Sequence, residues 1–520
     1  MKIDKVFQSA HQYYQAGDLN QASNVCKKIL RVQPRNIIVL HFLGGICYQL
    51  GDYDSSIDYL KKVLQIDPSH ADAYHNLGIA LQAKGQLHEA ISFFRKAANF
   101  HPSFAQAYYS LANALKKTGQ TDEAISCYRK VLQIVPDFVD AYNSLGNLMK
   151  KQGMVEEAIN CYQKALQINP VNPGILNNLG NVLYEAGCFD KALITYQNAL
   201  ELDPDYPYSH FHISRVLLLS GNYKQGWKEY EWRWKTKDYF ERDFSQPLWD
   251  GSDISGSTIL LYTEQGLGDA IQFIRYVPLV VQLGATIIVE CQKELVSLFR
   301  NVKGIKQVIS MGEQSPPFDM HCPLLSLPLE FNTTIETIPA EIPYIKVNTA
   351  FLQKWKDKLS DDNSKLKVGL VWAGSPTFKR SHLKKCPLEM FSPLAHNEDI
   401  TFYSLQKGKA AEQAKTPPDR MNLVDYTDEI DDFSDTAALI MNLDLVISVD
   451  TAVAHLSGAL GKPVWTLIPF APDWRWMLNR EDSPWYPTMR LIRQPSPGDW
   501  ESVINSVLKK LEVFIRDENR

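Results

Sequence analysis

The pattern of apolar and polar positions divides the 520-residue chain into two parts with different periods. Up to about residue 235, large apolar, small and helix-breaking residues return every 34 positions. One unit has large residues at Tyr74, Leu77, Leu81 and Phe94, with the small Ala90 between them. Because small residues allow two helices to approach closely, this pattern predicts a stack of helical hairpins.

The helix-breaking residues keep the same register. They are Gly17, Gly51, Gly85, Gly119, Gly153, Gly187 and Gly221, and Pro34, Pro68, Pro102, Pro136, Pro170 and Pro204. Glycine separates the two helices of a unit, and proline closes the second helix. The arrangement resembles the tetratricopeptide repeat, with six full units over about 3–206 and a degraded seventh that ends at residues 230–234. We therefore expect an all-α solenoid over residues 1–235.

A row of asparagines lies on the first helix of successive units. The row consists of Asn113, Asn143, Asn147, Asn177 and Asn181. In the repeat family this helix lines a concave groove, which usually binds an extended peptide or a protein surface. A carboxamide has two donors and an acceptor, so the row can hold a peptide backbone without reading its sequence. The alternative, that asparagine is simply common at this repeat position, stays open.

Beyond residue 235, short β-branched runs alternate with helical stretches, which is typical of parallel sheets covered by helices. Residues 236–257 are rich in turn-forming residues and are expected to be a linker. We expect two doubly wound lobes, 258–348 and 349–520, and a final crossing helix at about 499–516. The predicted strands are 258–263, 285–290, 306–310, 367–372, 400–405, 445–449 and 463–468, and the main predicted helices are 269–283, 293–302, 433–443 and 451–460.

One strand-to-helix turn, from Glu264 to Asp269, carries candidate chemistry. Gly266 and Gly268 suggest a dinucleotide-binding turn, but Ile271 stands where that fingerprint needs a third glycine. A nicotinamide cofactor is therefore not expected. Asp269 has two interpretations that do not exclude each other. It caps the helix, contributing about 1 kcal/mol, or it acts as a general base that accepts a proton from a hydroxyl.

A second turn of this kind runs from Ile447 to His455. A buried strand ends at Asp450, and a helix begins at once. The first N–H groups of that helix, its dipole and the Thr451 hydroxyl form an anion site suited to a diphosphate. His455 lies one turn along on the same face as Thr451. It is either a half-buried structural histidine or a donor to phosphate or ribose.

Together these turns resemble the bacterial lipopolysaccharide heptosyltransferase family. The resemblance covers about residues 255–515, and its motifs are 266–269, 275–278, 450–455 and 459–464. It implies a GT-B fold with two Rossmann-like lobes and an inverting, metal-independent transfer from a nucleotide-diphosphate sugar. The whole chain is similar to bacterial tetratricopeptide-repeat glycosyltransferases, in which the segments 230–234, 404–408 and 472–476 recur.

The resemblance implies roles for individual residues. Asp269 becomes the catalytic base on the acceptor side. The nucleotide-sugar contacts become Gly266, Gly268, Gly374, Ser375, Lys384, Gln406, Lys407, Asp450, Thr451, Ala452 and His455. Lys384 would neutralise the leaving diphosphate, with Lys385 as an alternative. Ala452 replaces a glycine common in heptosyltransferases, which leaves the donor open. Residues 474–476, 485 and 486 either line the sugar or base pocket or pack the lobes together.

Charge and composition exclude several partners. The 54 basic and 59 acidic residues give a net charge of −5, which argues against sequence-independent nucleic-acid binding. No run approaches the roughly 18 apolar residues of a membrane span, and the N-terminus shows no apolar signal core. The eight cysteines form no CxxC pair, which suits a reducing, cytoplasmic location and gives no metal site.

The leading hypothesis is an inverting, metal-independent glycosyltransferase without a cofactor, which O-glycosylates a protein captured by the repeat groove. One alternative is a non-catalytic repeat scaffold whose second half binds a nucleotide sugar. Another is a lipopolysaccharide or polysaccharide glycosyltransferase whose repeats serve oligomerisation. The nucleotide, the sugar, the acceptor and the presence of a homo-oligomer stay open.

Overall fold

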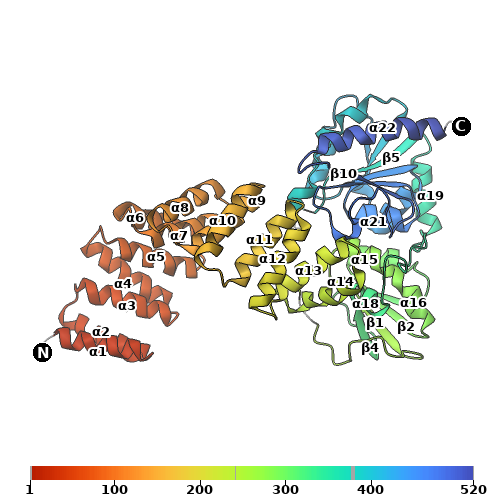
Figure 1. Cartoon of the computed structure of the whole chain (residues 1–520). Coiled ribbons are helices and arrows are strands. Elements are labelled where there is room, and N and C mark those ends of the chain that lie inside the picture. Colours follow the sequence, from red (N-terminus) through yellow and green to blue (C-terminus); the bar gives the residue numbers. More distant parts are fainter. Residues whose placement is uncertain (1–2, 240–241, 376–380, 519–520) are drawn as a thin grey trace. The chain divides into compact units, whose positions relative to one another are not determined.

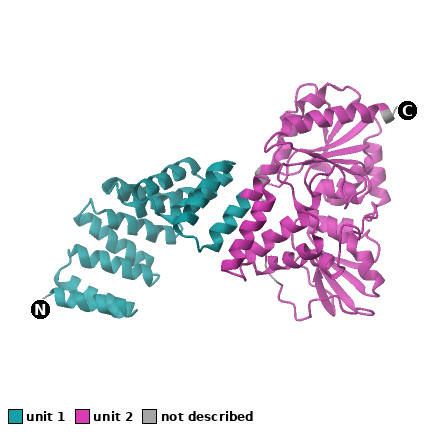
Figure 2. Ribbon diagram, viewed as in Figure 1, with its two compact units in different colours: residues 1–182 teal, residues 183–520 magenta. Residues whose placement is uncertain are grey.

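The computed structural model describes residues 3–239, 242–375 and 381–518, and the chain forms two compact units. The first unit contains residues 1–182 and the second contains residues 183–520 (Figure 2). The repeat pattern ends near residue 235, so the last repeat helices belong to the second unit. The reason is burial, because Tyr184 and Trp227 from these helices lie in the same hydrophobic core as the α/β residues.

Paired helices form the repeat region, and the all-α prediction is confirmed. The helices are α1 (Ile3–Gln15), α2 (Leu19–Val32), α3 (Ile37–Gln49), α4 (Tyr53–Ile66), α5 (Ala71–Ala83), α6 (Leu87–Phe100), α7 (Ala105–Lys117), α8 (Thr121–Ile134), α9 (Val139–Lys151), α10 (Val155–Ile168), α11 (Pro173–Glu185), α12 (Phe189–Leu202), α13 (Pro207–Leu219) and α14 (Tyr223–Tyr230) (Figure 1).

Close helix contact explains the small residues of the repeat. Ala90 is fully buried, and a Cβ added at Gly78 would lie 2.5 Å from Cε1 of Phe94 on the paired helix. Glycine is also needed in the turns, because Gly119 has a φ of +80°, where a residue with a side chain is strained. Both requirements recur every 34 residues, which is why the sequence pattern predicted this unit well.

The first lobe of the second unit is built on a four-stranded parallel sheet in the order β3-β2-β1-β4. Its strands are β1 (Thr258–Tyr262), β2 (Thr286–Cys291), β3 (Ile305–Ser310) and β4 (Met320–Pro323). Its helices are α15 (Leu267–Phe273), α16 (Val277–Gln282), α17 (Val296–Phe299) and α18 (Leu327–Glu330). The helix predicted at 269–283 is therefore interrupted, and a 3₁₀ turn separates α15 from α16 just before Pro278.

The second lobe has a six-stranded parallel sheet in the order β10-β9-β8-β5-β6-β7. This is the doubly wound order, with its switch point between β5 and β8. The strands are β5 (Leu366–Val371), β6 (Ile400–Ser404), β7 (Leu423–Asp425), β8 (Leu445–Val449), β9 (Val464–Ile468) and β10 (Met489–Arg493). The helices are α19 (Thr349–Lys358), α20 (Phe433–Met441), α21 (Ala452–Ala459) and α22 (Trp500–Glu518).

Short 3₁₀ segments connect these elements. They are η1 (Glu231–Lys235), η2 (Ile274–Tyr276), η3 (Lys293–Leu295), η4 (Leu324–Ser326), η5 (Ser381–Lys384), η6 (Leu388–His396), η7 (Lys409–Lys415), η8 (Thr427–Glu429) and η9 (Trp474–Trp476). The parallel α/β prediction is confirmed. The sequence analysis missed β4, β7 and β10, because these strands are short or contain few β-branched residues.

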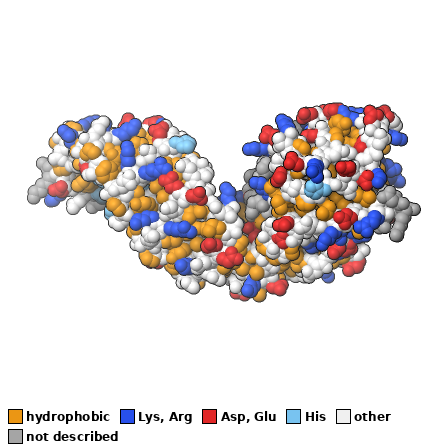
Figure 3. Space-filling view, turned by 90° about the horizontal axis from the view of Figure 1, so that it is seen from above, with side chains coloured by type: hydrophobic (Ala, Val, Ile, Leu, Met, Phe, Trp, Pro, Cys, Tyr) orange, Lys and Arg blue, Asp and Glu red, His pale blue; other side chains and the backbone are white. Residues whose placement is uncertain are grey.

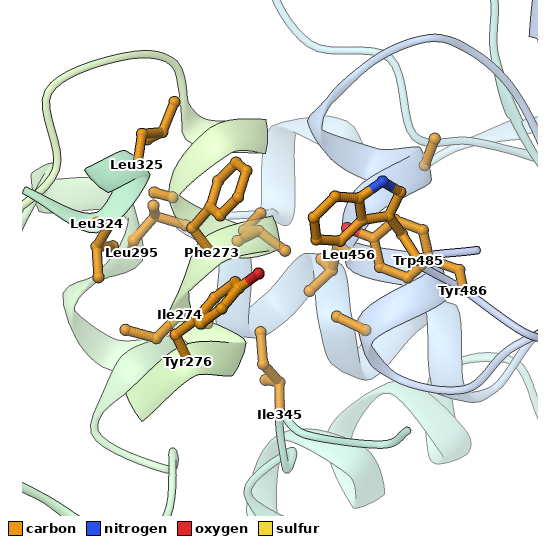
Figure 4. Close-up of a cluster of buried hydrophobic side chains, with 14 of the residues drawn as sticks. Phe273, Ile274, Tyr276, Leu295, Leu324, Leu325, Ile345, Leu456, Trp485 and Tyr486 are labelled. Atoms are coloured by element: carbon orange, nitrogen blue, oxygen red, sulfur yellow. The ribbon is translucent and has the colours of Figure 1, made fainter. Parts of the chain in front are cut away.

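One hydrophobic core joins the two lobes. Phe273 and Tyr276 from the first lobe and Leu456 and Trp485 from the second are buried in the same cluster (Figure 4). The guanidinium of Arg275 reinforces this contact, donating to the Trp485 carbonyl oxygen at 2.6 Å. Trp485 therefore packs the two lobes together, which is one of the two roles that the sequence analysis left open for the aromatic residues near the C-terminus.

Two predicted segments differ from expectation in their packing. In the expected linker, Trp249 and Ile254 are buried in the same core as residues of the first lobe. The final helix α22 packs on the second lobe, where Phe514 contacts Trp465 at 5.9 Å between ring centroids. It covers its own sheet, whereas a crossing helix was expected. Across the described ranges, no helix is both long enough and apolar enough to cross a bilayer.

Candidate functional site

The turn after β1 places an acid at the carboxyl end of the first sheet. The helix α15 begins at Leu267, with Gly266 as its N-cap. Asp269 lies in the first turn of α15, and its Oδ2 accepts a hydrogen bond from the Gly266 N–H at 3.0 Å. Asp269 therefore stabilises the start of its own helix through one carboxylate oxygen, but from the first turn and not as the N-cap residue that the sequence analysis expected.

The turn after β8 lies at the switch point of the second sheet. Thr451 is the N-cap of α21, and its hydroxyl is 2.9 Å from the Ser448 hydroxyl. A Cβ on Gly374 would lie 4.0 Å from Cγ2 of Thr451, so the turns after β5 and β8 are neighbours. Doubly wound sheets bind ligands at this point, outside the carboxyl ends of the strands.

The lysine assigned to the leaving group reaches this turn. The Nζ of Lys384 is 2.5 Å from Oδ2 of Asp450, and both side chains are largely buried. Lys385 is exposed, and binding of the leaving group by either lysine stays a prediction. Ser375 is also exposed, at the end of the turn after β5.

The two turns meet where α15 faces α21. A Cβ on Gly268 would lie 2.9 Å from Cδ2 of His455 and 3.4 Å from Cα of Ala452. Any side chain at position 268 would therefore push α15 away from α21. Gly268 acts through this close approach, which brings the acid of one lobe beside the helix start of the other.

His455 is buried in this contact between the lobes. Its Nδ1 is 2.9 Å from the Tyr486 hydroxyl, and its ring stacks on Trp476 at 5.2 Å. Burial lowers the pKa of His455 to about 3, so the ring is neutral at pH 7. The structural interpretation of this histidine fits these contacts, and a contact with the nucleotide sugar stays a prediction.

An arginine from the second lobe holds the candidate base. Arg475 forms an ion pair with Oδ1 of Asp269, while its Nη1 is 2.8 Å from Oδ1 of Asp473. Its Nε donates to Oε1 of Gln272 at 2.5 Å, and its guanidinium lies 4.3 Å from the ring centroid of Trp474. The sequence analysis left two roles open for the segment that contains Arg475, lining the sugar or base pocket and packing the lobes together, and did not predict this ion pair.

Burial and charge act in opposite directions on this cluster. Burial raises the pKa of Asp269, and Arg475 opposes that rise. Burial also disfavours the charged form of Asp473, but Arg475 and Lys384 outweigh it and hold the pKa of Asp473 below its usual range. Lys384 also lowers the pKa of Asp269. The site is thus a group of two carboxyl groups, Asp269 and Asp473, and two cations, Arg475 and Lys384, drawn from both lobes.

A second buried cluster lies at the start of the same turn. The fully buried Arg233 of η1 contacts Oε1 of Glu264 at 3.1 Å, Oε1 of Glu231 at 2.5 Å and the Ser326 hydroxyl at 2.8 Å. Burial raises the pKa of Glu264 to about 7, even though Arg233 lowers it. The segment 230–234 therefore fastens the last repeat to the first lobe, a role that its motif did not reveal.

Two predicted nucleotide-sugar contacts hold the protein backbone. Oε1 of Gln406 accepts hydrogen bonds from the N–H groups of Trp372 and Ala373, at 3.1 and 2.8 Å. Nζ of Lys407 donates to the carbonyl oxygens of Thr427 and Ile430, at 2.7 and 3.0 Å. These bonds shape the loops after β5 and β7.

The asparagines of the repeat unit have neighbours within the solenoid. Oδ1 of Asn113 accepts from the Tyr128 hydroxyl at 2.6 Å, and Oδ1 of Asn147 accepts from Tyr162 at 3.0 Å. Asn143 accepts from Asn178 of the next repeat at 3.0 Å. Asn177 is buried and Asn181 is half-buried. Bonds of this kind fix how the carboxamides are oriented, and peptide binding by them stays a prediction.

Matches to family models agree with both halves. Tetratricopeptide-repeat models match residues 35–103, 93–126, 112–153, 151–187 and 173–206. The model for glycosyltransferase family 9 (heptosyltransferase) matches residues 429–476. The chain combines tetratricopeptide repeats with a glycosyltransferase family 9 segment. This segment contains the turn after β8, α21 and Arg475, and it supports a glycosyltransferase.

Similar proteins are known for parts of the chain. Protein FlbA of Caulobacter vibrioides is 27% identical over 328 residues, which are 58% of this chain and 55% of that protein. The chain thus spans about half the length of this relative. Crystal structures of MamA (30% identical, TM-score 0.30) and YrrB (20% identical, TM-score 0.33) cover 32% and 35% of the chain and 92% and 95% of their own chains.

Proposed function

We propose that the chain is an inverting, metal-independent glycosyltransferase of the two-lobed GT-B type, with a nucleotide-diphosphate sugar as its donor. The observation that supports this proposal most is the position of Asp269. This acid of the first lobe lies beside the start of α21 and shares its cluster with Lys384 of the second lobe. A base and an anion site are therefore close together, as direct displacement at a sugar carbon requires.

In the proposed reaction, Asp269 accepts the proton of an acceptor hydroxyl. The hydroxyl oxygen forms a bond to the anomeric carbon, while the bond from that carbon to the diphosphate oxygen breaks. The electron pair leaves with the nucleoside diphosphate. Lys384 and the first N–H groups of α21 stabilise the charge that develops on the leaving group.

Specific groups have to supply the phosphate affinity. The net charge of the chain is −5, and acidic and basic side chains are interspersed on the face shown in Figure 3. Diffuse electrostatic attraction is therefore weak, and the helix start at Thr451 with Lys384 carries the proposed binding. The same cluster, with Asp269 still ionisable, favours an active enzyme over a scaffold that only binds a nucleotide sugar.

We also propose that the acceptor is a protein or peptide held by the repeat unit. Tyr128 and Tyr162 occupy the carboxamide oxygens of Asn113 and Asn147, which leaves the N–H groups of these carboxamides as the donors for a bound backbone. Donors of this kind can bind the backbone carbonyl groups of an extended peptide of any sequence. The alternative to a peptide acceptor is a polysaccharide acceptor. Eight unpaired cysteines, most of them buried, suit a cytoplasmic location.

The substitution Asp269→Asn tests the catalytic proposal. The carboxamide keeps the size of the side chain but cannot accept the proton, so we expect transfer to fall by about 10²-fold or more. Thermal shifts induced by UDP, GDP, ADP or CDP should persist, because the proposed diphosphate site at Lys384 and Thr451 lies in the second lobe and does not include Asp269. The exposed Asp428→Asn is the control. Transfer at the wild-type rate by D269N would refute the base assignment, and nucleotide binding without any turnover by the wild type would favour the scaffold.

The triple substitution Asn113→Ala, Asn147→Ala and Asn181→Ala tests the acceptor proposal. Loss of three carboxamides should weaken binding of a peptide acceptor, measured as a higher KM, while donor hydrolysis stays at the wild-type rate. The control replaces the exposed Asn99 and Asn160 on second helices with alanine. An unchanged KM for peptides, or transfer to polysaccharide only, would contradict capture by the groove.

A further inference from the structure

Arg475 is bound on every side by groups of both lobes. Its Nη2 pairs with Asp269, its Nη1 with Asp473 at 2.8 Å and its Nε with Gln272 at 2.5 Å. Asp269 and Gln272 are one turn apart on α15, so a single guanidinium binds two side chains on the same helix face. A planar group with three acceptors and an aromatic ring beneath it has little freedom to move.

Burial differs between the two partners of the ion pair. The side chain of Arg475 is 8% exposed, whereas that of Asp269 is 20% exposed. The carboxylate can therefore still meet a substrate, while the guanidinium lies inside the protein. Burying a charged group is costly unless its partners compensate, and here Asp473 and Asp269 both do so.

We propose that Arg475 is a positioning residue, which holds the carboxylate of Asp269 in the orientation and the charged form that proton acceptance requires. This inference rests on the proposed function of Asp269 as the base. Arg475 does not touch the reacting atoms. It acts through Asp269, and Asp473 in turn holds Arg475 in place.

The physical reason is the competition between burial and charge at Asp269. Burial favours the neutral acid, which cannot accept a proton, and Arg475 is the first among the charges that oppose it. The other titratable groups that act on Asp269, or on which it acts, are Asp473, Lys384, Glu264, Tyr230 and Tyr239. Of these only Lys384 is a cation, so the loss of Arg475 leaves the carboxylate with mostly unfavourable neighbours.

The kinetic test compares the pH dependence of kcat/KM in the wild type, Arg475→Gln and Arg475→Lys. The donor is whichever of UDP-glucose, UDP-N-acetylglucosamine, GDP-mannose and ADP-heptose gives the largest thermal shift with the wild type. Without Arg475 the pKa of Asp269 rises, so the acidic limb of the profile moves to higher pH. We expect kcat/KM of R475Q to be at least about tenfold lower at pH 6 and to approach the wild type at pH 9.

The conservative variant and a nearby arginine are the controls. Arg475→Lys keeps a positive charge and should restore part of the shift, although it cannot reach three acceptors at once. Arg480→Gln removes a surface ion pair with Asp482 in the same segment and should leave the limb where it is. If R475Q lost the same fraction of activity at every pH, the role of Arg475 would be structural and the proposal would be wrong.

A second measurement needs no turnover. A group whose pKa is raised on folding destabilises the fold as the pH rises through that pKa, because the folded state holds the proton more tightly. From pH 5 to pH 8, the Tm of R475Q should therefore fall relative to R475Q/D269N by about 2 °C or more. Parallel curves would overturn the coupling of Arg475 to Asp269. Failure of the proposed function shows instead as transfer by D269N, so the two failures are distinguishable.

Discussion

The two units hold their charged residues in opposite ways. In the repeat unit, Arg95 pairs with Glu123 at 2.7 Å on the surface, where both side chains are more than 40% exposed. In the α/β unit, Arg233 and Arg475 are buried and each contacts two carboxylates. The repeat unit is stabilised by contacts between neighbouring helices, which tolerate local change. The α/β unit depends on charge pairs between distant segments, and its candidate site is made of the same pairs.

The largest expected difference comes from removing one arginine from each unit. Arg233→Met leaves the buried Glu264 and the half-buried Glu231 without their cation, so we expect the free energy of unfolding to fall by about 3–5 kcal/mol. Arg95→Met removes only an exposed pair, and its cost should be at most about 1 kcal/mol. Hydrogen exchange localises each effect, to α14 and β1 in the first case and to α6 and α8 in the second. If both variants lost the same free energy of unfolding, the two units would not differ in how much they depend on their charge pairs.

A smaller effect tests where the first unit ends. Gly119 and Gly187 occupy the same repeat position with φ of +80° and +75°. Alanine at Gly119 meets nothing within 4 Å, so it should cost only about 1 kcal/mol of backbone strain. At Gly187 a Cβ would lie 2.6 Å from Cε1 of Phe470, which adds about 1–3 kcal/mol of overpacking.

The melting temperatures of G119A and G187A measure this difference. A larger decrease for G187A would sharpen the division of the chain near residue 182, because the same repeat position then differs only in its tertiary neighbours. If both variants melted at the same temperature, the last repeats would behave like the first ones, and their packing against the α/β core would contribute little.

Local patterns predicted elements accurately where each element is specified by its own residues. The turn glycines were assigned correctly to the turns between paired helices, and the strands β1, β5, β6, β8 and β9 were placed within about one residue of their bounds. The glycine turn at Gly266 and the helix start at Thr451 were found for the same reason. The interruption after Phe273 was missed, because the pattern does not separate a 3₁₀ turn from a helix.

The candidate site was predicted in part. Asp269, Lys384, Asp450 and Thr451 carry motif signals, and the structure brings them close to one another. Gln406 and Lys407 carried similar signals and bind the backbone of neighbouring loops, and their contact with a nucleotide sugar stays a prediction. A residue that holds a loop and one that binds a ligand have the same chemistry, so the sequence does not distinguish them.

The sequence by itself determined the 34-residue period, the change to parallel α/β units and the positions of the two chemical turns. Each of these depends on backbone preferences and on spacing within a few turns of chain. Only the tertiary structure decided that the last repeats join the α/β core and that Arg475 pairs with Asp269, 206 residues away. A buried ion pair forms wherever two distant elements bring opposite charges together, and no local pattern records that meeting.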